Sequence, residues 1–168
     1  MHKRWIGCVG IALAIVVFGA PASAQQVAQA AANGVLASAQ FSQDPDLRCD
    51  LLEVKRVSGG ALMVRWRIVN TAGQSAAGGG FASSSPGKAI RYSFHWDELF
   101  FIDPGENKKY LPLTDSANKQ IAQVYEGDLA PGQQRLSWAK FPAPPANSTK
   151  ISVTIPHFAP FEDAPVAQ

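Results

Sequence analysis

The sequence predicts an all-β fold, an antiparallel β-sandwich of about seven to eight short strands. Three observations predict it. Apolar and polar residues alternate in short runs, turn-forming residues separate the runs about every 10–15 positions, and no run has the apolar spacing of an amphipathic helix. Two sheets packed face to face would bury large aromatic side chains between them. We expect that core to contain Trp66, Phe94, Trp96, Phe101 and Trp138.

Residues 1–24 have the composition of a signal peptide. A basic head precedes an unbroken apolar run over 5–18, and small residues then mark a cleavage point expected between Ala24 and Gln25. The apolar run has about 14 residues, whereas roughly 20 are needed to cross a bilayer. We therefore expect a periplasmic or secreted protein with no membrane span after signal removal.

The charge of the expected mature chain gives no support for binding to nucleic acid or to a membrane surface. Two of the 15 basic residues lie in the signal peptide, which leaves 13 basic residues against 13 acidic ones. A mixed, neutral surface lacks the basic patch that such partners require. The expected partner is an envelope or extracellular protein.

The mature chain is expected to consist of a tether and one domain. Residues 25–45 are rich in Ala, Gln and Ser and hold few large apolar side chains, which predicts a flexible tether. The sandwich domain is expected at 46–166, a length that buries enough surface to fold without a disulfide or a metal ion.

The clearest element is a hairpin near the start of the domain. Its first run changes phase after Leu51, which predicts a β-bulge. Gly59 and Gly60 can adopt the positive φ angles of a tight turn. The second run alternates cleanly and places Arg65 and Arg67 on its polar face.

Further strands are expected after residues 70–88, a Gly- and Ser-rich segment that we interpret as a long flexible connection. Pro156 is expected to end the last of them. These expected strands cover 90–97, 99–102, 110–113, 120–125, 135–141 and 151–155.

Few residues could carry chemistry. His95 and His157 are the only imidazole bases of the mature chain, and no serine lies in a nucleophile elbow. We expect both histidines to be ordinary surface or corner residues and predict no enzymatic activity. No pair of potential ligands has a short metal-binding spacing, so no metal or other cofactor is expected. Cys49 shares a phase with Leu47 and Leu51, which favours a buried, unreactive thiol over an intermolecular disulfide.

Two features are candidates for recognition. Phe81 lies at the centre of the Gly-rich loop and could anchor in a partner's pocket; the alternative is a plain connector whose Phe81 folds back onto the domain. Arg65 and Arg67, together with Arg91, could meet an acidic polymer. The alternative is that these arginines pair with neighbouring carboxylates and keep the sheet soluble.

Four segments carry a resemblance to a known class of domain: LLEVKRVSGGALMVRWRIVN, FFIDPGENKKYLPLTD, the LAPGQ turn before Trp138, and FPAPPANSTKISVTIPHFAPFEDAPV. On these segments, 46–166 resembles the small secreted immunoglobulin-like sandwich domains of unknown function found in bacterial envelope proteins, some of them ahead of OmpA-like domains. The resemblance implies an immunoglobulin-like sandwich with an adhesive, scaffolding or accessory role. It implies no catalytic residues.

The leading functional hypothesis is an exported, non-catalytic protein-interaction or scaffolding module of the bacterial cell envelope. A second hypothesis is an inhibitor of a secreted hydrolase that uses the Gly-rich loop 71–88. A third is a carrier of a small ligand or a metal.

Overall fold

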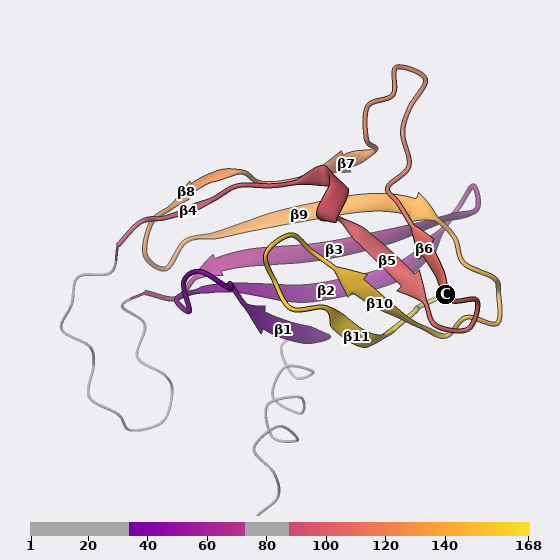
Figure 1. The fold of residues 1–168 in the computed structure, drawn as a ribbon, viewed down its shortest axis with the longest axis horizontal. Helices are drawn as coiled ribbons and strands as arrows, with labels where there is room; N and C mark the ends of the chain where they lie inside the picture. The colour runs from indigo at the N-terminus through magenta and orange to yellow at the C-terminus, as the bar shows by residue number, and fades with distance from the viewer. Residues whose placement is uncertain (1–33, 73–87) are drawn as a thin grey trace, which may run out of the picture.

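The computed structural model describes residues 34–72 and 88–168 (Figure 1). Within these ranges the regular structure consists of antiparallel strands and one short 3₁₀ helix, η1 (Trp96–Glu98), with no α-helix. The predicted all-β class is therefore confirmed. No helix of the described ranges is long and apolar enough to cross a membrane.

The largest sheet has five strands in the order β1, β2, β3, β9, β7 and is built on the predicted hairpin. The register of β2 and β3 shifts between Leu51 and Glu53, where the bulge was expected. Gly59 and Gly60 close the hairpin with φ angles of 81° and 68°, which residues with a side chain rarely adopt. Hairpin and bulge are both confirmed. The strands are β1 (Ala37–Gln40), β2 (Leu47–Val57), β3 (Ala61–Asn70), β9 (Gln134–Pro142) and β7 (Ala122–Gln123).

A four-stranded sheet and a two-stranded sheet complete the described structure. The four-stranded sheet has the order β11, β10, β5, β6, and the two-stranded sheet pairs β4 with β8. The strands are β11 (Phe161–Pro165), β10 (Lys150–Thr154), β5 (Phe100–Asp103), β6 (Lys108–Tyr110), β4 (Ile90–Tyr92) and β8 (Gly127–Leu129).

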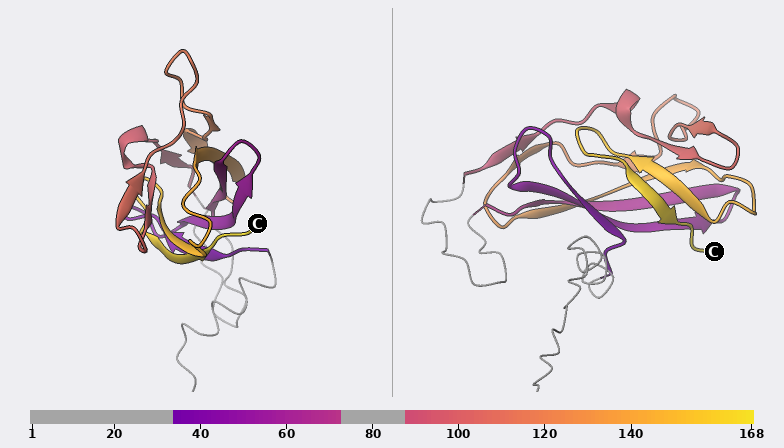
Figure 2. Two further views of the ribbon diagram at one scale, coloured as in Figure 1. Left: turned by 90° about the vertical axis from the view of Figure 1, so that its right-hand side faces the viewer. Right: turned by 60° about the horizontal axis from the view of Figure 1, so that its bottom comes forward.

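The end of the chain joins the second sheet to the first. The Ala167 N–H donates to the Val54 carbonyl, and the Arg56 N–H donates to the Ala167 carbonyl. The last residues therefore run parallel to β2. Figure 2 shows the yellow β10 and β11 alongside the indigo and purple strands of the large sheet.

The two larger sheets share one aromatic core. Phe101 on β5 stacks on Tyr110 at 4.5 Å between ring centroids and meets Phe141 of β9 edge-on at 5.4 Å. Trp66 on β3 stacks on Phe94 at 6.4 Å. Trp66 and Phe101 are buried as expected, because each projects from its strand toward the opposite layer. Phe94 is also buried as expected, although it lies between β4 and η1 rather than in a strand, and Trp96 of η1 is only partly buried against this core.

Trp138 is not in the core, contrary to the sequence-based expectation. Ser137, Ala139 and Phe141 are the β9 residues that point inward, and Trp138 is only partly buried on the other side of the strand. The expectation followed the large apolar residues at 136 and 138, whereas pairing with β3 determines which phase of β9 faces the interior.

Several expected boundaries are wrong, and the strand expected over 110–113 is β6 at Lys108–Tyr110. Residues 25–45 are not tether throughout, since β1 pairs with β2 and Phe41 is buried. Pro156 does not follow the last strand, because β11 returns beside β10. The expected strand over 90–97 ends at Tyr92, and η1 follows it. In each case, pairing between segments far apart in the chain decides where a strand begins or ends, and the local pattern of apolar and polar residues does not.

Several predictions lie outside the described residues. They are the signal peptide 1–24 with its cleavage point between Ala24 and Gln25, and Phe81 with most of the Gly-rich loop 71–88.

Candidate functional site

The outward side of the five-stranded sheet carries the two predicted arginines of β3. Side chains alternate between the two faces of a strand, and the register of β2, β3 and β9 determines which of them share the solvent side. We call this set the outer face. It consists of Arg48, Asp50, Glu53, Lys55, Met63, Arg65, Arg67, Leu136, Trp138 and Lys140.

Apolar side chains of β9 lie next to the arginines of β3 on the outer face. Arg65 is the register partner of Trp138, and Arg67 is the partner of Leu136. Leu136 is 57% exposed, and the indole N–H of the half-buried Trp138 donates to Gln123 Oε1 at 3.3 Å. The structure thus brings the predicted interaction residues together with two apolar side chains, of which Trp138 was expected to be buried.

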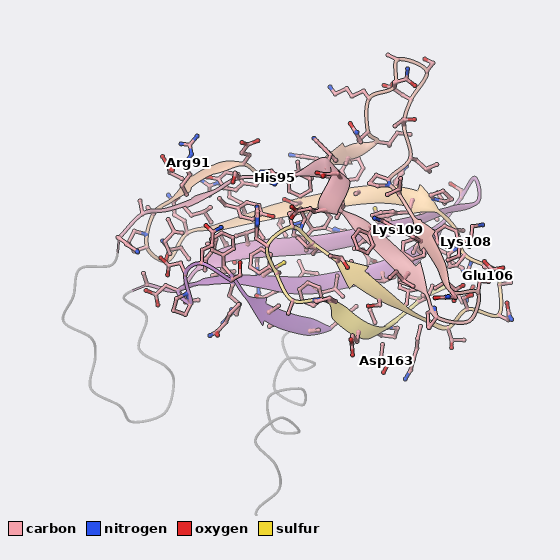
Figure 3. All side chains as sticks on the ribbon, viewed as in Figure 1. Arg91, His95, Glu106, Lys108, Lys109 and Asp163 are labelled. Atoms are coloured by element: carbon pink, nitrogen blue, oxygen red, sulfur yellow. The ribbon has the colours of Figure 1, made fainter. Side chains whose placement is uncertain are left out.

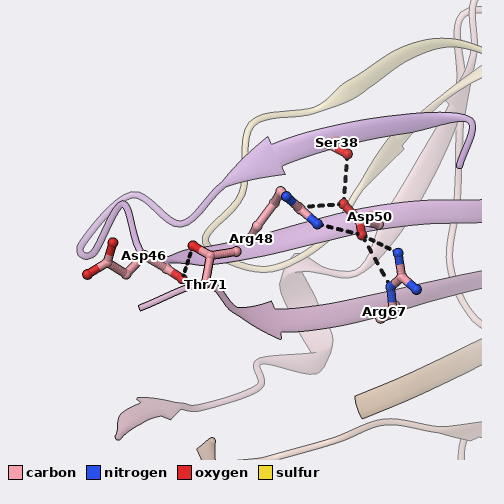
Figure 4. A network of polar contacts seen from close by, with 6 residues as sticks. All are labelled: Ser38, Asp46, Arg48, Asp50, Arg67 and Thr71. Carbon is pink, nitrogen blue, oxygen red and sulfur yellow. Dashed lines mark hydrogen bonds and ion pairs between the residues drawn. The ribbon is translucent and has the colours of Figure 1, made fainter. Parts of the chain in front are cut away.

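Asp50 anchors the outer face through a network of polar contacts (Figure 4). Its side chain is 1% exposed and accepts hydrogen bonds from Ser38 Oγ at 2.7 Å, Arg48 Nε at 2.8 Å and Arg67 Nη2 at 2.7 Å. Burial raises the pKa of Asp50, but the hydrogen bonds from Ser38, Arg67 and Arg48 outweigh it, so the pKa lies below its ordinary value. Arg67 therefore pairs with a buried carboxylate. This agrees with the alternative given above, that these arginines pair with neighbouring carboxylates.

The other two arginines differ in their surroundings. Arg65 is exposed, and its Nη1 lies 3.5 Å from Glu53 Oε2, a loose pair at the surface. Arg91 belongs to β4 and lies 3.6 Å from Asp128, so it is not part of the outer face (Figure 3). Of the two predicted recognition residues on the outer face, Arg65 has the guanidinium more available to a partner, since its side chain is 47% exposed and that of Arg67 is 27% exposed.

A second cluster of polar side chains forms around η1. His95 precedes this 3₁₀ helix and Glu98 is its last residue. Side chains three positions apart eclipse each other on a 3₁₀ helix, which places His95 Nδ1 3.5 Å from Glu98 Oε1. Figure 3 shows His95 where η1 begins.

His157 reaches the same cluster from the turn between β10 and β11. Its φ angle is 68°, a left-handed conformation that is uncommon for residues other than glycine. Its ring packs edge-on against Phe41 at 5.7 Å and Tyr92 at 6.4 Å between centroids, and its backbone carbonyl accepts from the Ser42 N–H. The ring is therefore held in one position.

The held ring faces the other two members of the cluster. His157 Nδ1 lies 4.0 Å from Glu98 Oε2, and the centroids of the His157 and His95 rings are 4.9 Å apart. The His157 side chain is 17% exposed, and its Nε2 is buried with no hydrogen-bond partner among the described residues. Polar contacts of this ring are therefore directed through Nδ1 toward Glu98.

Reasoning from the sequence missed this cluster. His95 is a surface residue and His157 lies in a turn, as expected, but the two side chains are neighbours and both lie close to Glu98. Continuing strand alternation through position 98 placed His95 and Glu98 on opposite faces, whereas the 3₁₀ turn places them side by side. The spacing His-x-x-Glu was the only available signal, and nothing in the sequence connected it to His157.

Cys49 projects inward from β2 and is completely buried. Burial, with a smaller contribution from the nearby charge of Asp50, raises the pKa of this thiol. The predicted burial is confirmed, and the position excludes Cys49 from both the outer face and the histidine cluster.

No family model, curated protein or solved structure matches the chain.

Proposed function

We propose that this chain is an exported, non-catalytic interaction or scaffolding module of the bacterial cell envelope, and that the outer face binds its partner. The main support for this proposal is that Leu136 is exposed and lies beside Arg65 and Trp138. Tryptophan and arginine are enriched among residues that dominate binding energy, and an exposed leucine adds apolar area at the same place.

Charge indicates the kind of partner. The outer face holds five basic side chains (Arg48, Lys55, Arg65, Arg67 and Lys140) and two acidic ones (Asp50 and Glu53). A protein surface that presents apolar side chains within an acidic rim complements this pattern. The occupant we propose is therefore an acidic protein of the envelope or the extracellular space.

The absence of catalysis is part of the proposal. Among the described residues, the two imidazole bases contact each other and Glu98 rather than a serine or a thiol, and Cys49 is buried in the core. Nucleophilic catalysis requires a base within hydrogen-bond distance of its nucleophile.

An immunoglobulin-like topology is the architecture we propose for the domain. A tryptophan buried between antiparallel sheets, here Trp66 on β3, is a feature of such sandwiches. The resemblance of 46–166 to secreted domains of this class supports the same proposal.

The test compares two variants in photo-crosslinking and pull-down experiments on envelope extract. The double variant Leu136→Glu/Arg65→Gln changes the outer face, whereas Leu111→Glu changes an equally exposed leucine outside it. We expect wild type and Leu111→Glu to capture the same acidic partner and the double variant to lose it, with capture weakening as salt is raised. Equal capture by all three proteins, with circular dichroism showing that each is folded, would contradict the proposal.

Export is tested separately by sequencing the amino terminus of the protein recovered from cell fractions. We expect the mature chain to begin at Gln25 and to lie outside the cytoplasm. A chain that retains Met1 in the cytoplasm would contradict export and leave the test of the outer face unaffected. The inhibitor hypothesis is tested by deleting residues 74–86, which should abolish inhibition of a secreted hydrolase if that loop is inhibitory.

A further inference from the structure

We propose that His95, Glu98 and His157 bind one divalent transition-metal ion, and that zinc is the ion they fit best. Their potential ligand atoms all lie within 4.8 Å of one another. This site is independent of the proposed partner surface, because none of the three residues belongs to the outer face.

The distances are close to those of a formed site. Zinc holds nitrogen and oxygen ligands at about 2.0–2.2 Å, so neighbouring ligand atoms of a tetrahedral site lie about 3.3–3.5 Å apart. Glu98 Oε1 is 3.5 Å from His95 Nδ1, and Glu98 Oε2 is 4.0 Å from His157 Nδ1. No separation within the cluster exceeds 4.8 Å, so binding one ion requires the ligand atoms to approach one another by about 1.5 Å or less.

The cluster is arranged before any ion binds. The 3₁₀ turn aligns His95 with Glu98, and the packing of His157 against Phe41 and Tyr92 fixes its ring. Non-glycine residues with positive φ persist only where the surrounding structure imposes them, and they concentrate at functional sites. The left-handed backbone of His157 places its ring next to His95 and Glu98. The role of this conformation is therefore to position a metal ligand.

The ligand types select the ion. Two imidazoles and one carboxylate suit zinc and other divalent transition ions, whereas magnesium and calcium prefer a set made only of oxygen atoms. In the described ranges the only thiol is that of Cys49, which is buried in the core and cannot join the cluster to select copper(I). The side chains of His95 and Glu98 are 50% and 45% exposed, so a water molecule can complete the tetrahedron.

Isothermal titration with zinc chloride tests the site. The protein is produced from the full 168-residue sequence without a polyhistidine tag and is first treated with a chelator. We expect one zinc ion per chain, a melting temperature that rises with zinc concentration, and no such response to magnesium. A cobalt(II) titration should give the intense visible absorption of a tetrahedral site.

Two variants remove ligands while preserving the backbone. His157→Asn suits the positive φ angle, which asparagine tolerates, and His95→Gln changes a half-exposed side chain. Each should weaken zinc binding by at least about tenfold, since the loss of even an outer partner of a metal ligand costs about 10- to 100-fold in affinity. The control Asp97→Asn, on the same 3₁₀ turn but outside the cluster, should bind as wild type does.

The proposal is overturned if folded wild-type protein binds no zinc, if both ligand variants bind zinc as wild type does, or if magnesium binds equally well. Circular dichroism of each variant separates the loss of a ligand from the loss of the fold.

Discussion

The guanidinium of Arg67 on β3 lies 2.7 Å from the buried carboxylate of Asp50 on β2, its partner across the hairpin. This contact decides what the arginine does. A carboxylate that is 1% exposed requires hydrogen bonds and opposite charge to remain ionised, and Arg67, Arg48 and Ser38 supply both. One of the two arginines on the polar face of β3 therefore stabilises the sheet, and Arg65 beside it stays available to a partner.

Replacing the buried carboxylate should destabilise the protein. Asp50→Asn is expected to lower the free energy of unfolding by about 1–3 kcal/mol, because it weakens several charge-assisted hydrogen bonds at once. The loss stays moderate because Arg48 and Arg67, which are 41% and 27% exposed, regain contact with water. Urea denaturation measures the effect. Glu53→Gln, which changes the loose surface pair with Arg65, should cost less than about 1 kcal/mol; equal losses would contradict this assignment.

The lowered pKa of Asp50 makes the free energy of unfolding depend on pH. The pKa of folded Asp50 lies below its ordinary value, so the unfolded chain binds a proton first as the pH falls. The contribution of Asp50 is therefore fully present above its unfolded pKa of about 3.9 and is lost as the pH falls through the lower folded pKa. Denaturation curves between neutral and acidic pH measure this. Asp50→Asn should flatten the acid side of the profile, and an unchanged profile would show that other carboxylates control it.

Asn70 should be essential for holding the two-stranded sheet against the end of β3. Its completely buried side chain donates from Nδ2 to the carbonyls of Lys88 and Leu129, both at 2.9 Å, and accepts from the Ala72 N–H at 2.9 Å. Asn70→Ala leaves these groups without partners and is expected to cost about 2–4 kcal/mol.

Two further variants make the Asn70 prediction specific. Asn70→Asp should destabilise at least as much as Asn70→Ala, because it directs a negative charge at two carbonyl oxygens. Asn147→Ala, at an exposed position, should change the free energy of unfolding by less than about 0.5 kcal/mol. Thermal and urea unfolding give both numbers, and a neutral Asn70→Ala would refute the assignment.

Cys49 should be unreactive in the folded protein. Burial raises the pKa of its thiol, and the thiolate is the form that reacts with alkylating agents. We expect iodoacetamide to modify Cys49 slowly in native conditions and completely in guanidinium chloride, as measured by mass spectrometry of the peptide that carries it. Equally fast labelling in both conditions, or an intermolecular disulfide through Cys49, would contradict the burial described here.

Local alternation was sufficient to predict the hairpin. Inward residues such as Leu62 and Trp66 recur at every second position of β3, and the phase change after Leu51 marks the bulge. Gly59 and Gly60 predicted the turn because their backbone angles are costly for other residues. These features depend only on neighbours in the chain, so the sequence contains them.

The face of β9 could not be predicted in the same way. Leu136 and Trp138 are the larger apolar residues of that strand, yet Ser137 and Ala139 point inward. Nine paired positions with β3 decide the phase, and those partners lie far away in the sequence. Because Leu136 and Trp138 face outward, apolar side chains lie beside Arg65, and this arrangement forms the candidate partner surface.

The sequence by itself determined the all-β class and the central hairpin, because side-chain alternation and turn preference act over a few residues. Only the tertiary structure decided which side chains meet on the outer face and that His157 joins His95 and Glu98. Those encounters depend on strand register and on the packing of turns separated by about 60 residues, and contacts over that distance leave no periodic signal in the chain.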